Sequence, residues 1–366
     1  MSDETLALVL DTGSYSTKIG YSGAEKPQCV FRTLCAYKQG EELVVGQAAL
    51  NHVDSSTIIS PFIHGIVRNW ALAERIWKHA FDNALKVPQT SHPLLLSEPP
   101  LNPKLHREKC AQLLFEAFEV PGLFICPSSL MALYGSGKTS GLVVDVGEGV
   151  SHAVPVLEGT PLPHAVQRLD IGGSDLTSFL VSKIPELNPS LYQSRIIAND
   201  IKSACCYMAS NYNQQLQSVE KSPAQFTKKY SLPDGNVISL GKEVFQCPEI
   251  ILAPHLFGRY CPSLIDVVCH SARSCEPEHH KTMFTNILLT GGSTMFDGFL
   301  QRCEKELKEA THDNVSLKVM HNIPNRDIAV WTGGSIVASL SSFQQMWVTK
   351  EEYDESGPTV VHRKCF

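Results

Sequence analysis

Residues 6–20 read LALVLDTGSYSTKIG, and residues 141–154 read GLVVDVGEGVSHAV. Each stretch runs from an apolar strand into an aspartate, Asp11 or Asp145, then into a glycine-containing turn, and then into a second strand. A turn of this kind exposes backbone N–H groups that can bind an anion, and glycine lets the main chain approach that anion closely. Two such turns facing each other would hold one phosphate chain from both sides, so we predict a nucleotide between two related halves.

The two aspartates also predict a metal ion. Mg²⁺ keeps most of its water ligands and takes few ligands from the protein. Asp11 and Asp145 would therefore contact it through water, while the ion bridges the phosphates. The alternative, in which both aspartates only cap their turns, stays open at this stage.

Length and composition indicate a globular protein with more than one domain. The 366 residues exceed the range of a single hydrophobic core, and 43% hydrophobic with 19% charged residues excludes a disordered chain. A net charge of −6 without a Lys/Arg-rich run argues against nucleic-acid binding. No apolar run is long enough for a bilayer, and the acidic first residues do not suit a signal peptide. We expect no membrane association and a cytoplasmic, or nuclear, protein.

The cysteines and histidines do not predict a metal site. The twelve cysteines lack the paired spacing of zinc ligands, so we expect reduced and mostly buried thiols, with Cys365 the most exposed. The pair His279-His280 lies in a polar stretch and is expected to face solvent.

Strands alternate with helices along the chain, which favours an α/β class. We predict a short buried strand over residues 94–97 and, from apolar residues at helical spacing, helices over 72–85 and 104–119. Both helices are expected to pack against a sheet. Pro233-Asp234-Gly235 predicts a hairpin turn.

Two double glycines add to the nucleotide hypothesis. Thr290-Gly291-Gly292-Ser293-Thr294 follows the apolar strand 287–289, and VWTGGS at 330–335 has the same pattern; an apolar helix is expected after each. A Gly-Gly turn between a strand and a helix gives a ligand access to the backbone, although such glycines also serve close packing. Together with the two aspartate turns, they predict four strand ends converging on one cleft.

The chain resembles the actin family nearly from end to end. The stretches that carry the resemblance are HGIVRNW (64–70), PPLNPK (99–104), LPHAVQRLDIGGSDLT (162–177), YSLPDGNVISLG (230–241), TGGSTMFDG (290–298) and WTGGSIVASLSSFQQMW (331–347) with the tail GPTVVHRKCF. The resemblance implies the α/β actin-like ATPase fold, in which two ribonuclease-H-like domains surround a nucleotide cleft. Residues 1–135, with 328–366 packed back on them, would form the first domain. Residues 136–327 would form the second, with a small subdomain at 172–262.

The resemblance further implies ATP or ADP with Mg²⁺ as the ligand. Asp11 and Asp145 would organise the waters of the metal ion, and His152 would lie near the attacking water. The implied nucleotide-binding residues are Gly13, Ser14, Lys18, Gly147, Glu148, Gly149, Lys202, Gly291, Gly292 and Met295.

Five residues depart from the family pattern at this implied site. They are Tyr15 for a glycine, Ser128 for the glutamine that orients the attacking water, Glu148 for an aspartate, Ser203 for a ribose-binding glutamate, and Asp327 for a lysine at the adenine end. A serine is too short to position the water, and a tyrosine would be strained if its position needs a positive φ. We therefore expect weak or static nucleotide binding with little hydrolysis.

Assembly is expected to differ from that of actin as well. The loop that in actins inserts into the next filament subunit is short and polar here, at residues 38–42, which predicts poor self-polymerisation; the alternative is a simple solvated hairpin tip. Asp3 and Glu4 form a shorter acidic cluster than in actins, which makes motor binding there doubtful. A groove that in the family accepts apolar helices is matched by Tyr134, Thr139, Val337, Leu340, Met346 and Phe366. Ordinary core packing is the alternative for Val337 and Leu340.

These observations together favour a divergent actin-like structural or scaffold protein of the cytoskeleton. We expect it to associate with actin-family subunits or actin-binding proteins at the groove. Two alternatives remain: an active ATP-hydrolysing, filament-forming actin, and a nuclear actin-related subunit of a chromatin complex. Ser128 and the short loop argue against the first, and the lack of insertions argues against the second.

Overall fold

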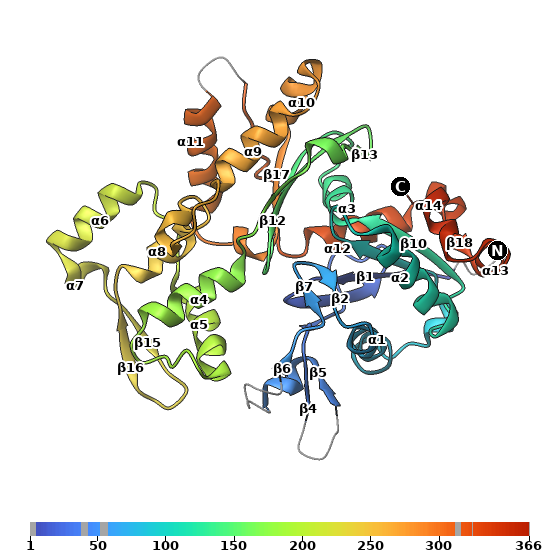
Figure 1. The fold of residues 1–366 in the computed structure, drawn as a ribbon, viewed down its shortest axis with the longest axis horizontal. Coiled ribbons are helices and arrows are strands. Elements are labelled where there is room, and N and C mark those ends of the chain that lie inside the picture. The colour runs from blue at the N-terminus through green and yellow to red at the C-terminus, as the bar shows by residue number, and fades with distance from the viewer. Residues whose placement is uncertain (1–4, 38–42, 52–57, 312–315, 324, 366) are drawn as a thin grey trace.

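The computed structural model describes residues 5–37, 43–51, 58–311, 316–323 and 325–365, which form two α/β halves (Figure 1). The first half is built on a six-stranded sheet in the order β18-β10-β9-β1-β2-β3. Its strands are β1 (Leu8–Thr12), β2 (Ser16–Tyr21), β3 (Cys29–Arg32), β9 (Leu94–Glu98), β10 (Gly122–Pro127) and β18 (Val348–Thr349). Because β18 pairs with β10, the C-terminal segment completes the sheet of the N-terminal half.

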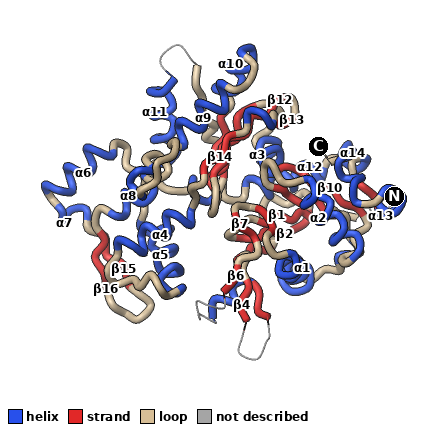
Figure 2. Tube along the Cα trace, viewed as in Figure 1, coloured by secondary structure: helices blue, strands red, loops and turns tan. Residues whose placement is uncertain are grey.

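The second half is built on a five-stranded sheet in the order β13-β12-β11-β17, with β14 paired to β12. Its strands are β11 (Gly141–Val146), β12 (Ser151–Leu157), β13 (Thr160–Pro161), β14 (Gln167–Leu169) and β17 (Ile287–Thr290). Figure 2 shows the two groups of strands flanked by helices. The predicted α/β class is confirmed.

The two sheets repeat one arrangement. In the first, β1 pairs antiparallel with β2, placing Asp11 opposite Lys18, and parallel with β9. In the second, β11 pairs antiparallel with β12, placing Asp145 opposite His152, and parallel with β17. The predicted strand-turn-strand pair is therefore confirmed, down to the same seven-residue offset across each hairpin.

Helices cover the first sheet and fill its core with large side chains. They are α1 (Trp70–His79), continued by a π-helical segment (Ala80–Leu85), α2 (Lys104–Glu116), α3 (Ser128–Gly135) and α12 (Ala329–Ser339). Trp77, Phe115 and Trp331 are almost fully buried, and the indole of Trp331 donates to the carbonyl of Val9 at 3.0 Å. The predicted helix 104–119 ends earlier, and its Ala117 is exposed.

Further helices extend the second half. In the first half, β4 (Cys35–Tyr37), β5 (Leu43–Val45) and β6 (Ile58–Ile59) form a separate small sheet. The remaining helices are α4 (Gly173–Lys183), α5 (Tyr192–Cys205), α6 (Tyr212–Lys221), α7 (Pro223–Phe226), α8 (Glu243–Glu249), α9 (Leu264–Arg273), α10 (His280–Thr285), α11 (Phe299–Thr311), α13 (Lys350–Ser356) and α14 (Val361–Lys364). The remaining strands are β7 (Phe62–Ile63), β8 (Ile66–Val67), β15 (Lys228–Ser231) and β16 (Val237–Leu240). The predicted hairpin turn at Pro233-Asp234-Gly235 joins β15 to β16 and is confirmed.

The fourth predicted strand end is wrong. Residues 330–335 lie inside α12 and not in a turn after a strand. A Cβ on Gly333 would lie 1.7 Å from the carbonyl oxygen of Met131 in α3, so this glycine lets two helices touch closely. Three glycine-containing strand ends, not four, remain as candidates for the cleft.

The predicted exposure of Cys365 is also wrong. Cys365 is 1% exposed, the amide of Ile125 donates to its sulfur at 3.3 Å, and burial raises the pKa of its thiol to about 11. Arg107 donates to the carbonyl oxygen of Cys365 at 2.7 Å, which ties the C-terminal end to α2. Cys261 is the exposed cysteine instead.

The pair His279-His280 is only partly exposed to solvent, and His280 Nε2 lies 2.9 Å from the carbonyl oxygen of Cys275. In the parts of the chain that the structure describes, no helix combines the length and apolarity needed to cross a membrane.

Candidate nucleotide site

The two aspartate turns have the same backbone geometry. In the first, the amide of Gly13 donates to the carbonyl oxygen of Ser16 at 3.0 Å. In the second, the amide of Gly147 donates to the carbonyl oxygen of Val150 at 3.1 Å. Each turn is therefore closed by one hydrogen bond from its glycine, and the residues at its tip are left outside the strand ladder.

The tips of both turns offer free backbone donors. Among the described residues, the amides of Ser14, Tyr15, Glu148 and Gly149 have no acceptor within the protein. Unpaired backbone N–H groups in a tight turn form a site suited to an anion. The turns therefore fit the phosphate groups of a nucleotide.

The first turn brings a cation and a carboxylate together. Lys18 Nζ lies 3.0 Å from Asp11 Oδ2, and Ser97 donates to Asp11 Oδ1 at 2.6 Å. Asp11 and Lys18 are each 8% exposed, so this ion pair is largely shielded from water. A compact lysine ammonium so placed is suited to phosphate oxygens.

The second turn supplies a carboxylate that is costly to ionise in the free protein. Burial, and then the negative charge of Asp11, raise the pKa of Asp145 to about 6, whereas the charge of Lys18 lowers it. A carboxylate whose pKa is raised by a neighbouring carboxylate lies where a cation is favourable. Among the described residues no group of three or more His, Cys, Asp or Glu side chains is placed to hold a metal directly. The aspartate pair therefore fits a metal held through water.

His152 lies opposite Asp145 in the β11–β12 register and is 3% exposed. Burial, and then the charge of Arg168, lower its pKa to about 4. The imidazole is therefore neutral at neutral pH and can accept a proton only at a considerable energetic cost.

The turn after β17 approaches the second aspartate turn closely. Gly291 has φ +94°, and a Cβ there would lie 2.4 Å from the carbonyl oxygen of Val146 and 2.7 Å from Asp145 Oδ1. By contrast, a Cβ on the exposed Gly292 would meet nothing within 4 Å, and Met295 is 39% exposed. Gly291 is thus needed for packing, whereas Gly292 and Met295 face open space.

Comparison with known families decides what this arrangement is. The Actin family model matches residues 2–191 and 183–366. This chain belongs to the actin family. The predicted family and the actin-like ATPase fold are both confirmed.

Sequence reasoning missed one glycine pair of this actin-family site, Gly172-Gly173, where α4 begins. A Cβ on Gly173 would lie 2.6 Å from Glu148 Oε2 and 3.2 Å from Lys202 Nζ. The signal was present, because IGGSD at 171–175 repeats the Gly-Gly-Ser pattern of residues 291–293.

Lys202 is used inside the protein. Its ammonium donates to the carbonyl oxygen of Gly173 at 2.8 Å and to Thr177 Oγ1 at 2.8 Å, and lies 3.9 Å from Glu148 Oε2. Burial lowers the pKa of Lys202 and raises that of Glu148. Lys202 therefore ties the start of α4 to the second turn, and Glu148 reaches toward it.

Tyr15 is placed without the strain that a positive φ would cause. It is not among the described residues with positive φ, so the condition for the expected backbone penalty is not met. Its hydroxyl accepts a hydrogen bond from Asn199 Nδ2 at 2.8 Å, and the guanidinium carbon of Arg32 lies 3.9 Å from its ring centroid.

The other three departures lie at different depths. Ser128 is half-buried and is the first residue of α3. Ser203 is exposed and its hydroxyl donates only to the carbonyl oxygen of Asn199, at 3.0 Å. Asp327 is exposed. None of the three side chains hydrogen-bonds to the aspartate turns among the described residues.

The predicted partner groove is only partly at the surface. Leu340 is 49% exposed and Thr139 is exposed, while Tyr134 and Met346 are half-buried. Val337 is 7% exposed and belongs to the core, so its prediction as a groove residue is wrong. The neighbouring Ile336, which the sequence reasoning did not single out, is 43% exposed.

Some predictions lie outside the described residues. These are the short loop at residues 38–42, the acidic residues Asp3 and Glu4, and the groove residue Phe366.

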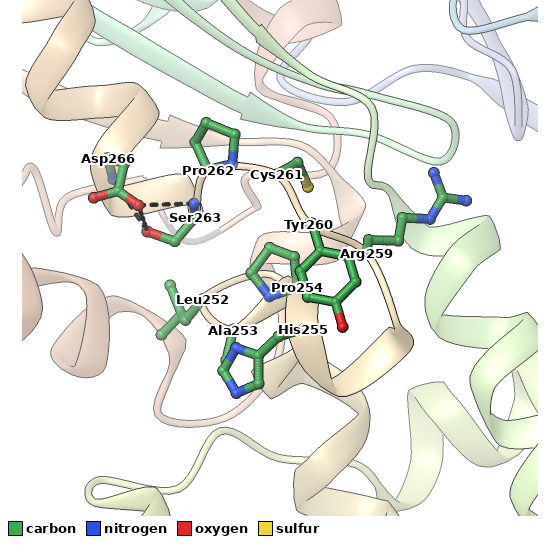
Figure 3. A pocket seen from close by; sticks show the side chains of 10 residues that line it. All are labelled: Leu252, Ala253, Pro254, His255, Arg259, Tyr260, Cys261, Pro262, Ser263 and Asp266. Carbon is green, nitrogen blue, oxygen red and sulfur yellow. Dashed lines mark hydrogen bonds between the residues drawn. The ribbon is translucent and has the colours of Figure 1, made fainter.

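An open hollow of about 470 Å³ lies between α8 and α9 (Figure 3). Tyr260 stands at its rim and is 99% exposed, next to the exposed Cys261. The carboxylate of Asp266 accepts from the amide and the hydroxyl of Ser263 and caps α9, so these polar groups already have partners. The hollow is separate from the aspartate turns.

Proposed function

We propose that this actin-family protein is a structural or scaffold component of the cytoskeleton that binds ATP or ADP weakly or statically and hydrolyses little ATP. The observation that carries the proposal is Ser128 at the first position of α3. The family resemblance puts a water-orienting glutamine at this position. A serine hydroxyl ends two atoms short of that amide, and positioning of the water is a main contribution to phosphoryl transfer.

Nucleotide binding is supported by the two turns. The free amides at their tips and Lys18 would hold phosphate oxygens, and Asp11 and Asp145 would hold the hydrated Mg²⁺. The ion, when bound, would neutralise phosphate charge. His152 stays neutral near the turns and is a poor proton acceptor, since its pKa is lowered to about 4.

Weak affinity is supported by the nucleoside end. Ser203 and Asp327 replace two side chains that contact ribose and adenine in the family, and the hydroxyl of Ser203 donates to its own helix. Losing two such contacts, at about 1–1.5 kcal/mol each, weakens binding roughly 30- to 100-fold.

A scaffold role is supported by apolar side chains beside α12. Ile336 is 43% and Leu340 is 49% exposed, and Met346 is half-buried nearby in sequence. Exposed apolar side chains at the end of a helix suit the apolar face of a partner helix. The partners we propose are actin-family subunits or actin-binding proteins, in the cytoplasm, with poor polymerisation of the chain alone.

The decisive experiment measures the nucleotide that purified protein carries. After denaturation, about one ADP per chain would indicate past hydrolysis and contradict the proposal, whereas ATP, or substoichiometric nucleotide, would support it. Sedimentation in polymerising salt should leave the chain in the supernatant, and robust pelleting without a partner would refute the scaffold role.

A restoring substitution tests the cause. Ser128→Gln returns the amide that the family uses, and should raise ATP turnover about tenfold or more if water positioning is what is missing. Ser203→Ala, which removes a hydroxyl that bonds only to its own helix, is the control and should leave turnover unchanged. Equal turnover in both variants would show that Ser128 does not explain low hydrolysis.

A further inference from the structure

A hydrogen bond joins the two halves of the molecule directly beside the candidate nucleotide site. Asn199, in α5 of the second half, donates from Nδ2 to the hydroxyl oxygen of Tyr15 at 2.8 Å. Tyr15 lies in the turn between β1 and β2, in the first half (Figure 1). The two residues are 184 positions apart, so this bond exists only while the halves are held in this arrangement.

Groups of the first half fix the position of Tyr15, whose hydroxyl contacts the second half. The guanidinium carbon of Arg32, at the end of β3, lies 3.9 Å from the Tyr15 ring centroid, which is a cation–π distance. The carbonyl oxygen of Tyr15 accepts from the amide of Thr33 at 2.9 Å. Arg32 Nε is buried and has no hydrogen-bond partner among the described residues.

Glu148, in the second phosphate turn, lies beside this contact. Tyr15, Asn199 and Glu148 line the same small hollow of about 50 Å³, together with side chains of α4 and α5. Gly149, the residue after Glu148, takes part in a second contact between the halves, because a Cβ there would lie 3.2 Å from the backbone nitrogen of His64. The ring of His64 in turn has its Nδ1 2.8 Å from Arg168 Nη2. Tyr15 thus closes the space between the turns at the side of α5.

We infer that Tyr15, Arg32 and Asn199 form a latch that holds the two halves together across the cleft whether or not a nucleotide is bound. A small residue at position 15 would remove this bond across the cleft and leave the Arg168–His64 contact in place. The latch joins the two halves through a side-chain contact and so needs no ligand for this. It does not depend on the proposed weak nucleotide binding, because it is made by protein groups alone.

The test is hydrogen–deuterium exchange of the full chain without nucleotide. Asn199→Ala removes the donor in the second half. The reporters are in the first half: the amide of Gly65, which donates to Ser14 Oγ at 2.8 Å, and the amide of Thr33. Losing one net hydrogen bond shifts the opening equilibrium by about 2- to 10-fold, so exchange at both amides should be faster by that factor. Ser203→Ala, one turn along the same helix, is the matched control and should change neither.

Tyr15→Phe gives a second, milder arm. It removes the hydroxyl but keeps the ring in contact with Arg32. Because the variant is in the first half, the faster exchange is expected in the second half, at α5. The double variant should exchange no faster than either single one, because both remove the same bond. Effects of Asn199→Ala confined to residues 192–205, or a double variant whose effect is the product of the single effects, would overturn the latch. All arms lack nucleotide, so this outcome leaves the proposed nucleotide site untouched.

Discussion

Replacing Asp145 with asparagine should stabilise the protein in the absence of nucleotide and abolish its response to Mg·ATP. The half-buried Asp145 lies close to Asp11, and its pKa is raised from its ordinary 3.8 to about 6 by desolvation of the carboxylate and by that neighbouring charge. The folded state therefore binds the proton of Asp145 more tightly than the unfolded state does. Asparagine has nearly the same shape and never carries the charge.

The sign and size of the effect follow from this pKa. A raised pKa contributes stability that is fully present below pH 3.8 and is lost as the pH rises through about 6. At pH 8 the ionised side chain therefore costs the folded state about 3 kcal/mol, given 1.36 kcal/mol per pH unit. Asp145→Asn should avoid this cost, with a gain of up to about 3 kcal/mol at pH 8 that fades toward pH 4.

The assay is thermal unfolding of nucleotide-free protein from pH 4.5 to pH 8. The variant should melt roughly 5 °C above the wild type at pH 8 and near it at pH 4.5. Asp82→Asn, at an exposed position, is the control and should follow the wild type throughout. Added Mg·ATP should raise the melting temperature of the wild type but not of Asp145→Asn. A variant that is less stable at every pH would refute the reasoning, because Asp145 would then be a favourable structural carboxylate.

Three further outcomes are expected. Gly291→Ala should lower the free energy of unfolding by about 3 kcal/mol, since φ is +94° and the new Cβ would lie 2.4 Å from a carbonyl oxygen, whereas Gly292→Ala should cost less than about 0.5 kcal/mol in denaturant titrations. A thiol reagent should modify Cys261 first in the native protein and Cys365 only after unfolding; rapid native labelling of Cys365, located by mass spectrometry, would contradict its burial. His152→Asn should reduce the stability lost between pH 7 and pH 5 by about 2 kcal/mol, because the lowered pKa of about 4 makes the unfolded state bind the proton first as the pH falls.

The part of the fold that depends on local pattern was predictable from sequence. The strand-turn-strand pairs around Asp11 and Asp145 were recognisable because an apolar run, an aspartate and a glycine specify a hairpin with few long-range requirements. The turn at Pro233-Asp234-Gly235 was predictable for the same reason.

Patterns whose meaning depends on a distant partner were misread. LLTGGS and VWTGGS look alike, yet Gly291 lies in a left-handed turn while Gly333 lies in the middle of α12. Only the backbone of α3, where a Cβ on Gly333 would meet Met131, distinguishes the two. Cys365 was expected at the surface because it is next to the last residue, but Ile125 and Arg107 enclose it.

The sequence alone therefore determined the family, the α/β class and the identity of the charged groups at the turns, because these are written in short segments of chain. Tertiary structure decided which side chains and backbone atoms those charged groups contact. It brought Asn199 to Tyr15, engaged Lys202 with the start of α4, and raised the pKa of Asp145. The physical reason is that burial, charge proximity and close backbone contact are properties of pairs far apart in the sequence, and only folding sets the distance between them.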